Sequence, residues 1–407
     1  MASRVKKITV LYIDQALAFG GSLVVAGYAI NSIDKEKFRS VFVGELDLET
    51  MRHFIGLDIP IYKVSKIINY ARWAKINSKI RLIRSDRFKK YITYLLSMFC
   101  SLLNTIYFIR VALIILKEGV DIVHVNNGLS NIEPILASII LRRVCVAHYH
   151  GDEKPSLFQR MVMNKVQKFI VISEYLKGEL VANGIPSKDM VVIHNPSQKK
   201  HIDVDDVEAM RKKFCVMPDD KVFGIVGRVV RWKGHIEFLN AAKIVLRDEP
   251  TSKALIIGDY SDGDLAYQEE VTRIIEESGF KDRIIFTGFV NNVQSFYQLM
   301  DVCVHTSIEP EPFGLVITEA MSYGVPVVAS DRGAPKEIIE DGLNGFIIDP
   351  EDTGKLVETI TRLLSDASLR DEIANKGSEH VKEAYNLSKF GDSLNRIYLK
   401  AVSNDKA

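Results

Sequence analysis

The sequence predicts an α/β protein made of two doubly wound, Rossmann-like domains, and three features lead to this prediction. Short runs rich in valine and isoleucine alternate with helix-length segments along most of the 407 residues. Such runs are typical of strands buried on both faces in a parallel sheet of β-α-β units. The series of runs starts again after a polar stretch at 196–220, and the chain is too long for one ordinary core. We therefore place a domain boundary at that stretch.

The expected strands form two series. Those of the first half are 8–13, 39–44, 121–126, 144–150, 168–173 and 191–195. Those of the second half are 221–227, 253–258, 284–289, 302–306, 326–330 and 345–349. The expected domains are 1–195, which includes a basic, amphipathic helical segment at 63–117, and 196–385. A helix at 386–407 is expected to pack back on the first domain.

Composition excludes several classes of protein. The apolar fraction of 47% and the charged fraction of 26% are those of a soluble globular protein. A net charge of +1 argues against a general nucleic-acid binder. The cysteines are scattered, without a CxxC pair, which indicates reduced thiols and no zinc site; they are Cys100, Cys145, Cys215 and Cys303. The apolar run 8–13 is too short for the core of a signal peptide.

The loops that follow strands are where chemistry is expected, because open α/β sheets bind ligands beyond the carboxyl ends of their strands. Gly20 and Gly21 follow the first strand and open a helix for which Ser22 is a plausible N-cap. Glycines let the backbone approach a ligand closely. A Gly-Gly pair after a strand is also a common simple turn.

A second loop, "GRVVRWKG" at 227–234, places Arg228 and Lys233 five residues apart at a strand end. A planar guanidinium and an ammonium beside a helix N-terminus suit a diphosphate. The same spacing also fits two solvated surface cations.

A third loop lies in "SIEPEPFGLVITEAMSYGVPVVAS" at 307–330. Prolines on both sides of Glu311 stiffen the loop, and a helix is expected to begin near Phe313. The first N–H groups of that helix have no intrahelical acceptor and form an anion site, with Glu319 in the second turn. Donors for phosphate beside acceptors for hydroxyls suit a nucleotide-sugar. The alternative is a pair of salt-bridged surface acids.

With these pieces the sequence resembles glycosyltransferase family 4, the retaining transferases of GT-B fold. "EPFGLVITE" matches the E-x7-E motif of the family, and "EAMSYGVPVVAS", "DGLNGFIIDPED" and "GRVVRWKG" match its other segments. "VISEYLKGELVANGIPSKDMVVIHNP" resembles the end of its N-terminal domain. The resemblance is strong over 168–385, looser over 1–60 and 121–151, and absent over 61–117.

The resemblance implies roles for the charged residues. Arg228 and Lys233 would bind the donor diphosphate and stabilise charge on the leaving group. Glu311 would contact hydroxyls of the transferred sugar, and Glu319 would bind the donor ribose. It implies that 1–195 binds the acceptor and that 196–385 binds the donor, on two domains that face each other across a cleft.

The resemblance also implies further contacts. Backbone N–H groups at three positions would hold sugar and phosphate, namely those of Phe313, Gly314 and Leu315. The turn near Val290 would line the base, and Gly20-Gly21 would face the donor phosphates. His150 would lie near the reacting centre, so the expected catalytic residues are Glu311, His150, Arg228 and Lys233.

Two departures from the family pattern bear on these roles. The usual Asn-Gly at the interdomain strand end is Asn195-Pro196 here. Strand alternation places His148 and His150 on one face, so either is a candidate for the functional histidine. His124 fits a structural role better.

Neither a metal nor another cofactor is expected. Asp262-Gly263-Asp264 spells a D-x-D metal motif, but Gly-Asp before a helix is a routine N-cap. Arg228 and Lys233 would neutralise the diphosphate without a metal. A dinucleotide-dependent dehydrogenase would need G-x-G-x-x-G after a strand, which is absent.

The expected function is therefore a retaining, metal-independent hexosyltransferase. It would move a sugar from a nucleotide-diphosphate-sugar to a glycan or lipid-linked acceptor in cell-surface polysaccharide or glycolipid synthesis. A front-face path in which the departing phosphate accepts the acceptor's proton is favoured over Glu311 as a nucleophile. A GT-B sugar-nucleotide epimerase and a non-catalytic GT-B subunit are the alternatives, and both UDP-sugars and GDP-sugars fit as donors.

Charge segregation predicts a membrane contact. Residues 63–90 hold ten Lys or Arg and one acid, so this segment carries +9 whereas the rest of the chain carries −8. A basic amphipathic surface for anionic lipid headgroups fits this pattern, and a solvated helical face is the alternative. The uncharged run 91–109 carries several polar residues and predicts a buried crossover helix rather than a spanning one. We expect a cytoplasmic enzyme, peripheral on the inner face of the membrane, without nucleic-acid partners.

Overall fold

The structure is a computed structural model that describes residues 6–16, 20–55, 59–67, 69, 72, 85–151, 154–185, 187, 189–260, 264–290 and 292–404. The chain forms two compact units. The first comprises Met1–Ile172, Lys177–Ile193 and Phe390–Ala407, and the second comprises Ser173–Leu176 and His194–Lys389. The boundary that the sequence predicts after residue 195 lies two residues beyond the division between Ile193 and His194.

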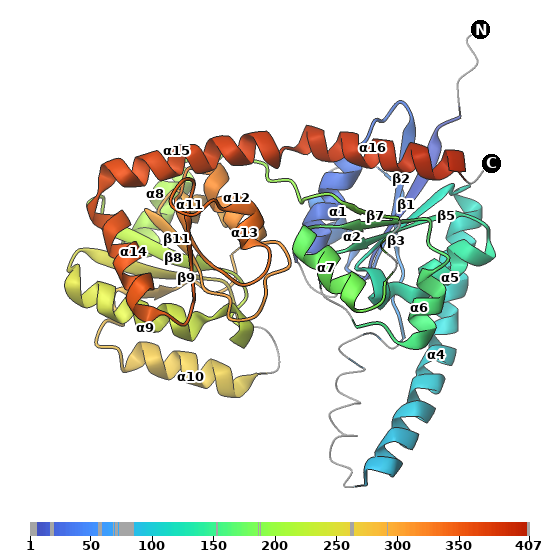
Figure 1. Ribbon diagram of the computed structural model, residues 1–407, viewed down its shortest axis with the longest axis horizontal. Helices are drawn as coiled ribbons and strands as arrows, with labels where there is room; N and C mark the ends of the chain where they lie inside the picture. The colour runs from blue at the N-terminus through green and yellow to red at the C-terminus, as the bar shows by residue number, and fades with distance from the viewer. Residues whose placement is uncertain are drawn as a thin grey trace. The chain divides into compact units, whose positions relative to one another are not determined.

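Within its described residues, the first unit holds a seven-stranded parallel sheet of order β3-β2-β1-β4-β5-β6-β7 (Figure 1). The strands are β1 (Ile8–Asp14), β2 (Phe38–Gly44), β3 (Ile61–Lys63), β4 (Ile122–Asn126), β5 (Val144–Tyr149), β6 (Lys168–Val171) and β7 (Met190–Val192). The edge strand β3 was not among the strands that the sequence predicts, because three partly exposed residues leave no apolar run.

Among the described residues, the helices of the first unit connect these strands, apart from α16, which follows the last helix of the second unit. They are α1 (Gly21–Ser32), α2 (Leu48–Ile55), α4 (Asp86–Lys117), α5 (Ile132–Ile140), α6 (Leu157–Met163), α7 (Glu174–Ala182) and α16 (Leu387–Asn404), with a 3-10 turn η1 (Gly128–Asn131). Both α7 and α16 have their first residues in the second unit. Tyr398 of α16 is buried in the first unit, where its hydroxyl contacts Tyr12 and His124.

Helix α4 shows why the expectation of a buried crossover helix holds on one face only. In its second half, Tyr107, Val111 and Ile115 are buried, whereas Ile106 and Leu113 are exposed. An amphipathic helix of this kind packs one stripe against the core and leaves the other in solvent. Among the helices in the described ranges, none combines the length and apolar content needed to cross a bilayer.

The second unit, as far as it is described, holds a six-stranded parallel sheet of order β10-β9-β8-β11-β12-β13. The strands are β8 (Lys221–Val226), β9 (Ser252–Ile257), β10 (Ile284–Phe286), β11 (Val302–His305), β12 (Val327–Ser330) and β13 (Phe346–Ile348). Each strand that the sequence predicts in the second half is confirmed. The strand expected at 284–289 ends early, since Gly288 adopts φ +66° and turns the chain.

The helices of this unit cover both faces of its sheet (Figure 1). They are α8 (Val204–Lys213), α9 (His235–Asp248), α10 (Leu265–Glu276), α11 (Gln294–Tyr297), α12 (Leu315–Ser322), α13 (Pro335–Ile338), α14 (Thr353–Ser365) and α15 (Ala367–Ala384), with a 3-10 turn η2 (Arg231–Lys233). Helix α9 buries Phe238, Ala241, Ala242 and Val245, the i, i+3, i+4, i+7 spacing of one helical face. Phe238 packs on Phe223 of β8, with ring centroids 5.8 Å apart. This packing anchors the strand that carries the 227–234 loop.

The strand order decides where a ligand can bind. In the second unit the order reverses between β8 and β11, and in the first unit it reverses between β1 and β4. The loops that leave two such strands turn to opposite faces of the sheet and open a crevice at the carboxyl edge. The 227–234 loop follows β8 and the loop with Glu311 follows β11, so both predicted donor loops lie at one switch point.

Candidate active site

The loops after β8 and β11 are hydrogen-bonded to each other. The Thr306 hydroxyl donates to the Gly234 carbonyl at 2.7 Å, and the Ile308 N–H donates to the Trp232 carbonyl at 2.8 Å. Gly234 adopts φ +70°, and a Cβ on it would lie 1.8 Å from the Thr306 carbonyl oxygen. Only glycine fits there, so this residue allows Lys233 to approach the Glu311 loop.

The loop after β12 fixes the backbone of Glu311. The Glu311 N–H donates to the Arg332 carbonyl at 3.1 Å, and the Ala334 N–H donates to the Glu311 carbonyl at 2.9 Å. A Cβ on Gly333 would lie 2.4 Å from that same carbonyl oxygen. Glu311 is therefore held by a neighbouring loop in addition to its flanking prolines.

The Glu311 carboxylate lies in a buried polar cluster. Lys233 Nζ lies 2.5 Å from Glu311 Oε2, and His305 Nε2 lies 3.0 Å from the same oxygen. Ser307 Oγ is 3.4 Å from Oε2 and 3.0 Å from His305 Nε2. Burial opposes ionisation, but Lys233 and the His305 hydrogen bond together hold the pKa of Glu311 well below its usual range. With 8% of its surface exposed, Glu311 is an ionised buried group rather than a surface acid.

His305 and Ser307 are site residues that the sequence analysis missed. Burial lowers the pKa of His305 despite the opposing effect of Glu311, which favours the neutral ring. His305 is the last residue of β11, and Ser307 follows two positions later. Two polar residues at alternate positions where an apolar strand ends were the available signal.

The two predicted cations differ in environment. Arg228 is exposed and has no hydrogen-bond or ion-pair partner in the part of the chain that the structure describes. The Lys233 side chain is 16% exposed, pairs with Glu311 and lies 4.1 Å from the centroid of the Trp232 ring. Arg228 is thus available to an anion as it stands, whereas Lys233 has a protein partner.

Helix α12 begins beside this cluster. Gly314 adopts φ +101° as the N-cap, and Phe313 before it is buried. Over the described ranges, no acceptor is found for the backbone N–H groups of Phe313, Gly314 and Leu315. Free N–H groups at a helix start bind anions and oxygen ligands.

Glu319 lies apart from the polar cluster, in an aromatic environment. The Tyr297 hydroxyl donates to Glu319 Oε2 at 3.2 Å, and the Tyr297 ring stacks on Tyr323 with centroids 5.6 Å apart. Burial raises the pKa of Glu319 to about 7, although Tyr297 and the Lys200 charge oppose the shift. Glu319 is therefore partly protonated at neutral pH, whereas Glu311 is ionised.

Two further predicted positions belong to loops of the second unit. Val290 is half-buried after the edge strand β10, two strands from β8 on the same carboxyl edge. Asp264 caps α10, accepting a hydrogen bond from the Tyr267 N–H at 3.0 Å, as the N-cap interpretation predicts. Asp262 and Gly263 of the D-x-D sequence lie outside the described residues.

The glycine pair of the first unit stands at the start of α1. Gly20 is the N-cap in an extended conformation, and Gly21 is the first helical residue. The prediction that Ser22 is the N-cap is wrong, since the helix begins one residue before it. A Cβ on Gly20 would meet no atom within 4 Å among the described residues, so packing within this unit does not require glycine there.

His124 of β4 and the two histidines of the β5 segment, His148 and His150, differ in burial. His148 Nδ1 lies 3.2 Å from His124 Nε2, and His124 Nδ1 lies 2.7 Å from the Tyr398 hydroxyl. Both rings are buried in this network, which gives each of them a structural role. His150 is partly exposed at the end of β5, and burial still lowers its pKa to about 3, so it is neutral.

Asp14 and Asn126 are further polar residues at this switch point, and the sequence analysis missed them. The Asn126 amide donates to Asp14 Oδ2 and to the Ser22 carbonyl, each at 3.0 Å. Its Oδ1 lies 3.2 Å from His150 Nε2. Asp14 ends β1 and Asn126 ends β4, so each is the polar residue that closes an apolar strand. That position was the signal for both.

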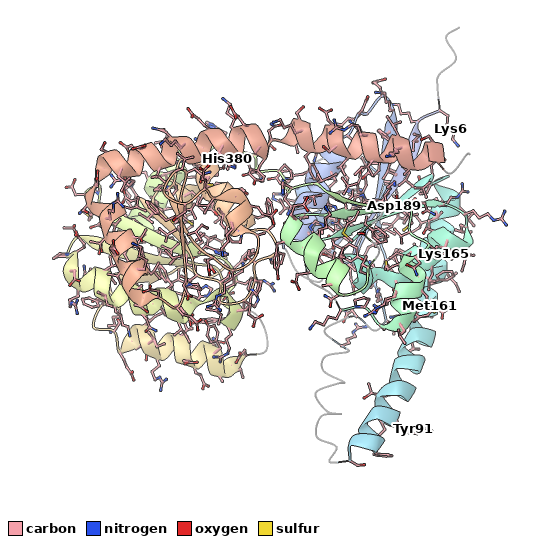
Figure 2. The ribbon with its side chains drawn as sticks, viewed as in Figure 1. Lys6, Tyr91, Met161, Lys165, Asp189 and His380 are labelled. Atoms are coloured by element: carbon pink, nitrogen blue, oxygen red, sulfur yellow. The ribbon has the colours of Figure 1, made fainter. Side chains whose placement is uncertain are left out.

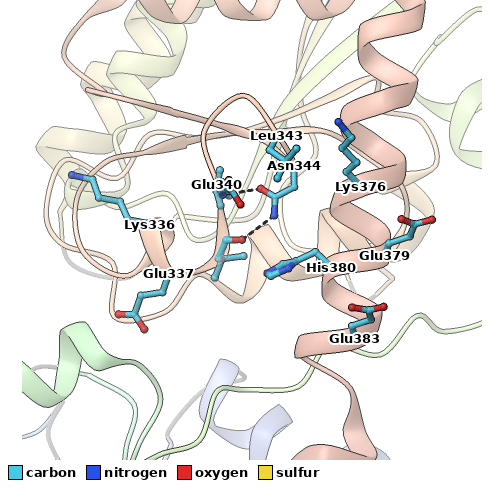
Figure 3. A pocket seen from close by; sticks show the side chains of 11 residues that line it. Lys336, Glu337, Glu340, Leu343, Asn344, Lys376, Glu379, His380 and Glu383 are labelled. Carbon is cyan, nitrogen blue, oxygen red and sulfur yellow. Dashed lines mark hydrogen bonds between the residues drawn. The ribbon is translucent and has the colours of Figure 1, made fainter.

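A separate pocket of about 680 Å³ contains none of the predicted site residues (Figure 3). Its lining comes from α13, α15 and the turn between α13 and β13, namely Lys336, Glu337, Ile338, Ile339, Glu340, Leu343, Asn344, Lys376, Glu379, His380 and Glu383. The turn is closed by Asn344, which accepts from the Glu340 N–H at 2.9 Å and donates to the Ile338 carbonyl at 3.3 Å. Its lining carries both acidic and basic side chains.

Two protein-family models match the chain. The model described as Glycosyl transferases group 1 matches residues 206–380, within the second unit. The model described as Glycosyltransferase Family 4 matches residues 79–197, mostly in the first unit.

Similar proteins of known name include several glycosyltransferases. The uncharacterized glycosyltransferase MJ1607 of Methanocaldococcus jannaschii is 31% identical over 240 residues, which cover 57% of this chain and 60% of that protein. The capsular polysaccharide biosynthesis glycosyltransferase CapM of Staphylococcus aureus is 26% identical over 60% of this chain and 64% of its own length. The N-acetyl-alpha-D-glucosaminyl L-malate synthase of Bacillus anthracis is 25% identical over 71% of this chain and 77% of its own. The chain thus spans less than two thirds of the first two of these relatives.

Solved structures share the fold over nearly the whole chain. Anabaena Alr3699/HepE in complex with UDP-glucose has a TM-score of 0.79 and 21% identity, and the match covers 97% of this chain and all of that one. A glycosyltransferase from Rickettsia africae has a TM-score of 0.77 and 20% identity, over 98% of this chain and 99% of its own. With both family models and two doubly wound parallel-sheet units, the chain belongs to glycosyltransferase family 4 and has the GT-B fold.

Proposed function

We propose that this chain is a retaining, metal-independent hexosyltransferase that moves a sugar from a nucleotide-diphosphate-sugar to a glycan or lipid-linked acceptor. The observation that carries the proposal is the cluster at the β8/β11 switch point. There Arg228 and the first N–H groups of α12, which have no partner among the described residues, stand on loops that adjoin the Lys233–Glu311 pair. Cations, N–H donors and an ionised acceptor are the groups that a sugar diphosphate requires.

The proposed chemistry follows the charge that develops. Departure of a nucleoside diphosphate places negative charge on the β-phosphate oxygens, which Arg228, Lys233 and the α12 N–H groups would stabilise. One preorganised donor of this kind contributes about 3–4 kcal/mol to the transition state. Glu311 would accept hydrogen bonds from hydroxyls of the transferred sugar, and the leaving phosphate would accept the acceptor's proton on the same face. Paired through Oε2 with Lys233 and His305, Glu311 suits an acceptor better than a nucleophile.

The donor is proposed to be a UDP-sugar. Alr3699/HepE, which shares the fold, has been crystallised with UDP and with UDP-glucose. Glu319 would take the ribose, and the loop at Val290 would line the base. In the first unit, His150 and Gly20-Gly21 are the residues proposed to contact ligand. The relative CapM acts in capsular polysaccharide biosynthesis by its name, which supports a polysaccharide or glycolipid product.

A donor screen followed by a transfer assay tests the function. Binding of the right nucleotide-sugar raises the melting temperature, since a ligand at 100 times its Kd stabilises the folded state by about 2.7 kcal/mol. The expected result is a shift with one UDP-sugar and a product of unchanged anomeric configuration. Epimerisation of the donor without an acceptor would indicate an epimerase. Failure of every UDP- and GDP-sugar to bind would contradict the proposed donor and would favour a non-catalytic subunit.

We also propose that the protein is cytoplasmic and binds the inner face of the membrane through the basic segment 63–90. Of that segment the structure describes 63–67, 69, 72 and 85–90, so Lys75, Lys79 and Arg81 lie outside the described residues. Exposed apolar side chains on α4, which continues from this segment, and on α6 support the proposal. Tyr91 of α4 is 59% exposed and Met161 of α6 is 68% exposed (Figure 2). Further along, α4 exposes Ile106, Ile109, Leu113 and Leu116.

A further inference from the structure

The two oxygens of the Glu311 carboxylate have different surroundings. Oε2 lies within hydrogen-bond distance of Lys233 Nζ, His305 Nε2 and Ser307 Oγ. Oε1 has no hydrogen-bond partner within the described ranges. One oxygen is thus held by the protein, and the other is available to a ligand.

We propose that His305, assisted by Ser307, is a positioning residue that holds Glu311 in place independently of Lys233, so that Lys233 is free to turn to the donor diphosphate. This inference rests on the proposed function, because it concerns how one lysine serves two anions. It assigns a role to His305, the last residue of β11, and to Ser307, two positions later.

The position of His305 suits a permanent holder. His305 is 3% exposed and pairs with Ala329 of β12. Its strand, β11, lies inside the sheet between β8 and β12. Ser307 is held in place as well, because the Ser330 hydroxyl donates to the Ser307 carbonyl at 2.6 Å. Lys233, by contrast, has a long flexible stem with three donor hydrogens and a partly exposed head.

The hydrogen-bond pattern fixes the tautomer of His305. An ionised Glu311 can only accept, so the His305 nitrogen that faces it must carry a proton. The other nitrogen, Nδ1, is buried and has no partner in the described structure. The ring therefore carries its proton on Nε2 and is neutral. A neutral donor orients the carboxylate without adding a second fixed charge.

The arrangement sets up a competition for Lys233. If His305 is removed, the buried carboxylate depends on Lys233 alone, because a buried charge without a partner is costly. Lys233 is then held more tightly by Glu311 and binds the diphosphate less well. His305 would thus affect diphosphate binding without touching the ligand.

Calorimetry of UDP binding, with inorganic pyrophosphate as a probe that lacks a base, tests this coupling. We expect His305→Leu to weaken binding of both probes by about 3- to 10-fold, which lies in the lower part of the range of coupling between neighbouring groups. His305→Gln, whose amide reaches the position of ring Nε2, is expected to restore most of the affinity. Adding Glu311→Gln to His305→Leu is also expected to restore it, because Lys233 then has no competing anion.

Two results would overturn the inference. One is a His305→Leu protein that binds both probes as the wild type does. The other is a weakened affinity that persists unchanged after Glu311→Gln, which would indicate a general structural defect.

A measurement on the wild-type protein tests the contact between His305 and Glu311 without relying on the donor assignment. The ¹⁵N spectrum of the histidine rings, with His305 assigned by its loss in His305→Gln, is expected to show the proton on Nε2. A proton on Nδ1 would refute the proposed holding contact, whatever the substrate is. Absence of UDP and pyrophosphate binding to the wild type would instead contradict the proposed function. The two failures are therefore distinguishable.

Discussion

Lys233 and Arg228 carry the same charge but are held differently, and this difference separates their roles. Lys233 is paired with the buried Glu311, whereas Arg228 is exposed and has no partner within the described ranges. Removing Arg228 would take away the proposed diphosphate contact without breaking an ion pair within the described residues. Removing Lys233 also leaves a buried carboxylate without its nearest counter-charge, which His305 offsets in part.

Arg228→Ala and Lys233→Ala are therefore expected to reduce turnover alike and to differ in stability. Each should lower kcat by roughly 100-fold or more, because each removes a donor to the leaving group. Urea unfolding should show a change within about 0.5 kcal/mol for Arg228→Ala and a loss of about 1–3 kcal/mol for Lys233→Ala. Near-normal turnover in both variants with every tested nucleotide-sugar would contradict the donor site.

The raised pKa of Glu319 predicts that the free energy of unfolding depends on pH through this one residue. Burial raises its pKa from 4.5 to about 7, so the folded state binds a proton that the unfolded state has released between those values. The stabilisation is complete below pH 4.5 and is lost as pH rises towards 7. Relative to Glu319→Gln, the wild type should lose about 1–3 kcal/mol of unfolding free energy between pH 4.5 and 8. Parallel stability curves for the two proteins over this range would rule out the shifted group.

At the scale of elements, close approach of the β8 and β11 loops builds the site, and Gly234 makes that approach possible. A matched control is available in Gly279, which has a similar φ of +78° but no atom within 4 Å of a built Cβ. Gly279→Ala is expected to cost about 1–2 kcal/mol from backbone strain alone. Gly234→Ala should cost more and should also lower kcat, because Lys233 is displaced from Glu311. Equal losses of stability with normal turnover would show that the loop contact is dispensable.

The apolar residues on α4 and α6 belong to the same scale, and so does the membrane prediction. Purified protein is expected to sediment with anionic vesicles at low salt and to be released at high salt, since screening weakens headgroup attraction. The quadruple variant Arg72→Gln, Lys75→Gln, Lys79→Gln, Arg81→Gln should lose this binding. Neutral vesicles provide the lipid control. Wild-type protein that ignores anionic vesicles would sink the membrane proposal and leave the donor site untouched.

At the scale of the whole molecule, the end of the chain belongs to the unit that its beginning forms. Residues Phe390–Ala407 join the first unit, where the Tyr398 hydroxyl links Tyr12 of β1 to His124 of β4. Tyr398→Phe should cost about 1–2 kcal/mol, because buried polar groups lose their partner. The exposed Tyr91 supplies a control, since Tyr91→Phe should change the unfolding free energy by less than about 0.5 kcal/mol. Equal effects of the two changes would show that the buried network contributes nothing.

Much of this molecule was accessible from the sequence. Strands buried on both faces leave continuous apolar runs, so the two parallel sheets and every strand of the second unit were predictable. Arg228, Lys233, Glu311 and Glu319 could be chosen as candidates because they stand at strand ends and in a motif, and their roles stay predictions. These features are local, and a local feature can be read along the chain.

Tertiary structure decided which of these groups meet and in what state. The sequence by itself determined that Glu311 follows β11. Only the fold brings Lys233, from the loop after β8, and His305, from the end of β11, to the same oxygen, because these two strands are far apart in the chain and adjacent in the sheet. It likewise separated His148, which is buried in a network with α16, from the partly exposed His150, although both share one strand face. Burial and charge pairing depend on long-range contacts. The pKa values of Glu311 and Glu319 therefore move in opposite directions, although the two residues belong to one short motif.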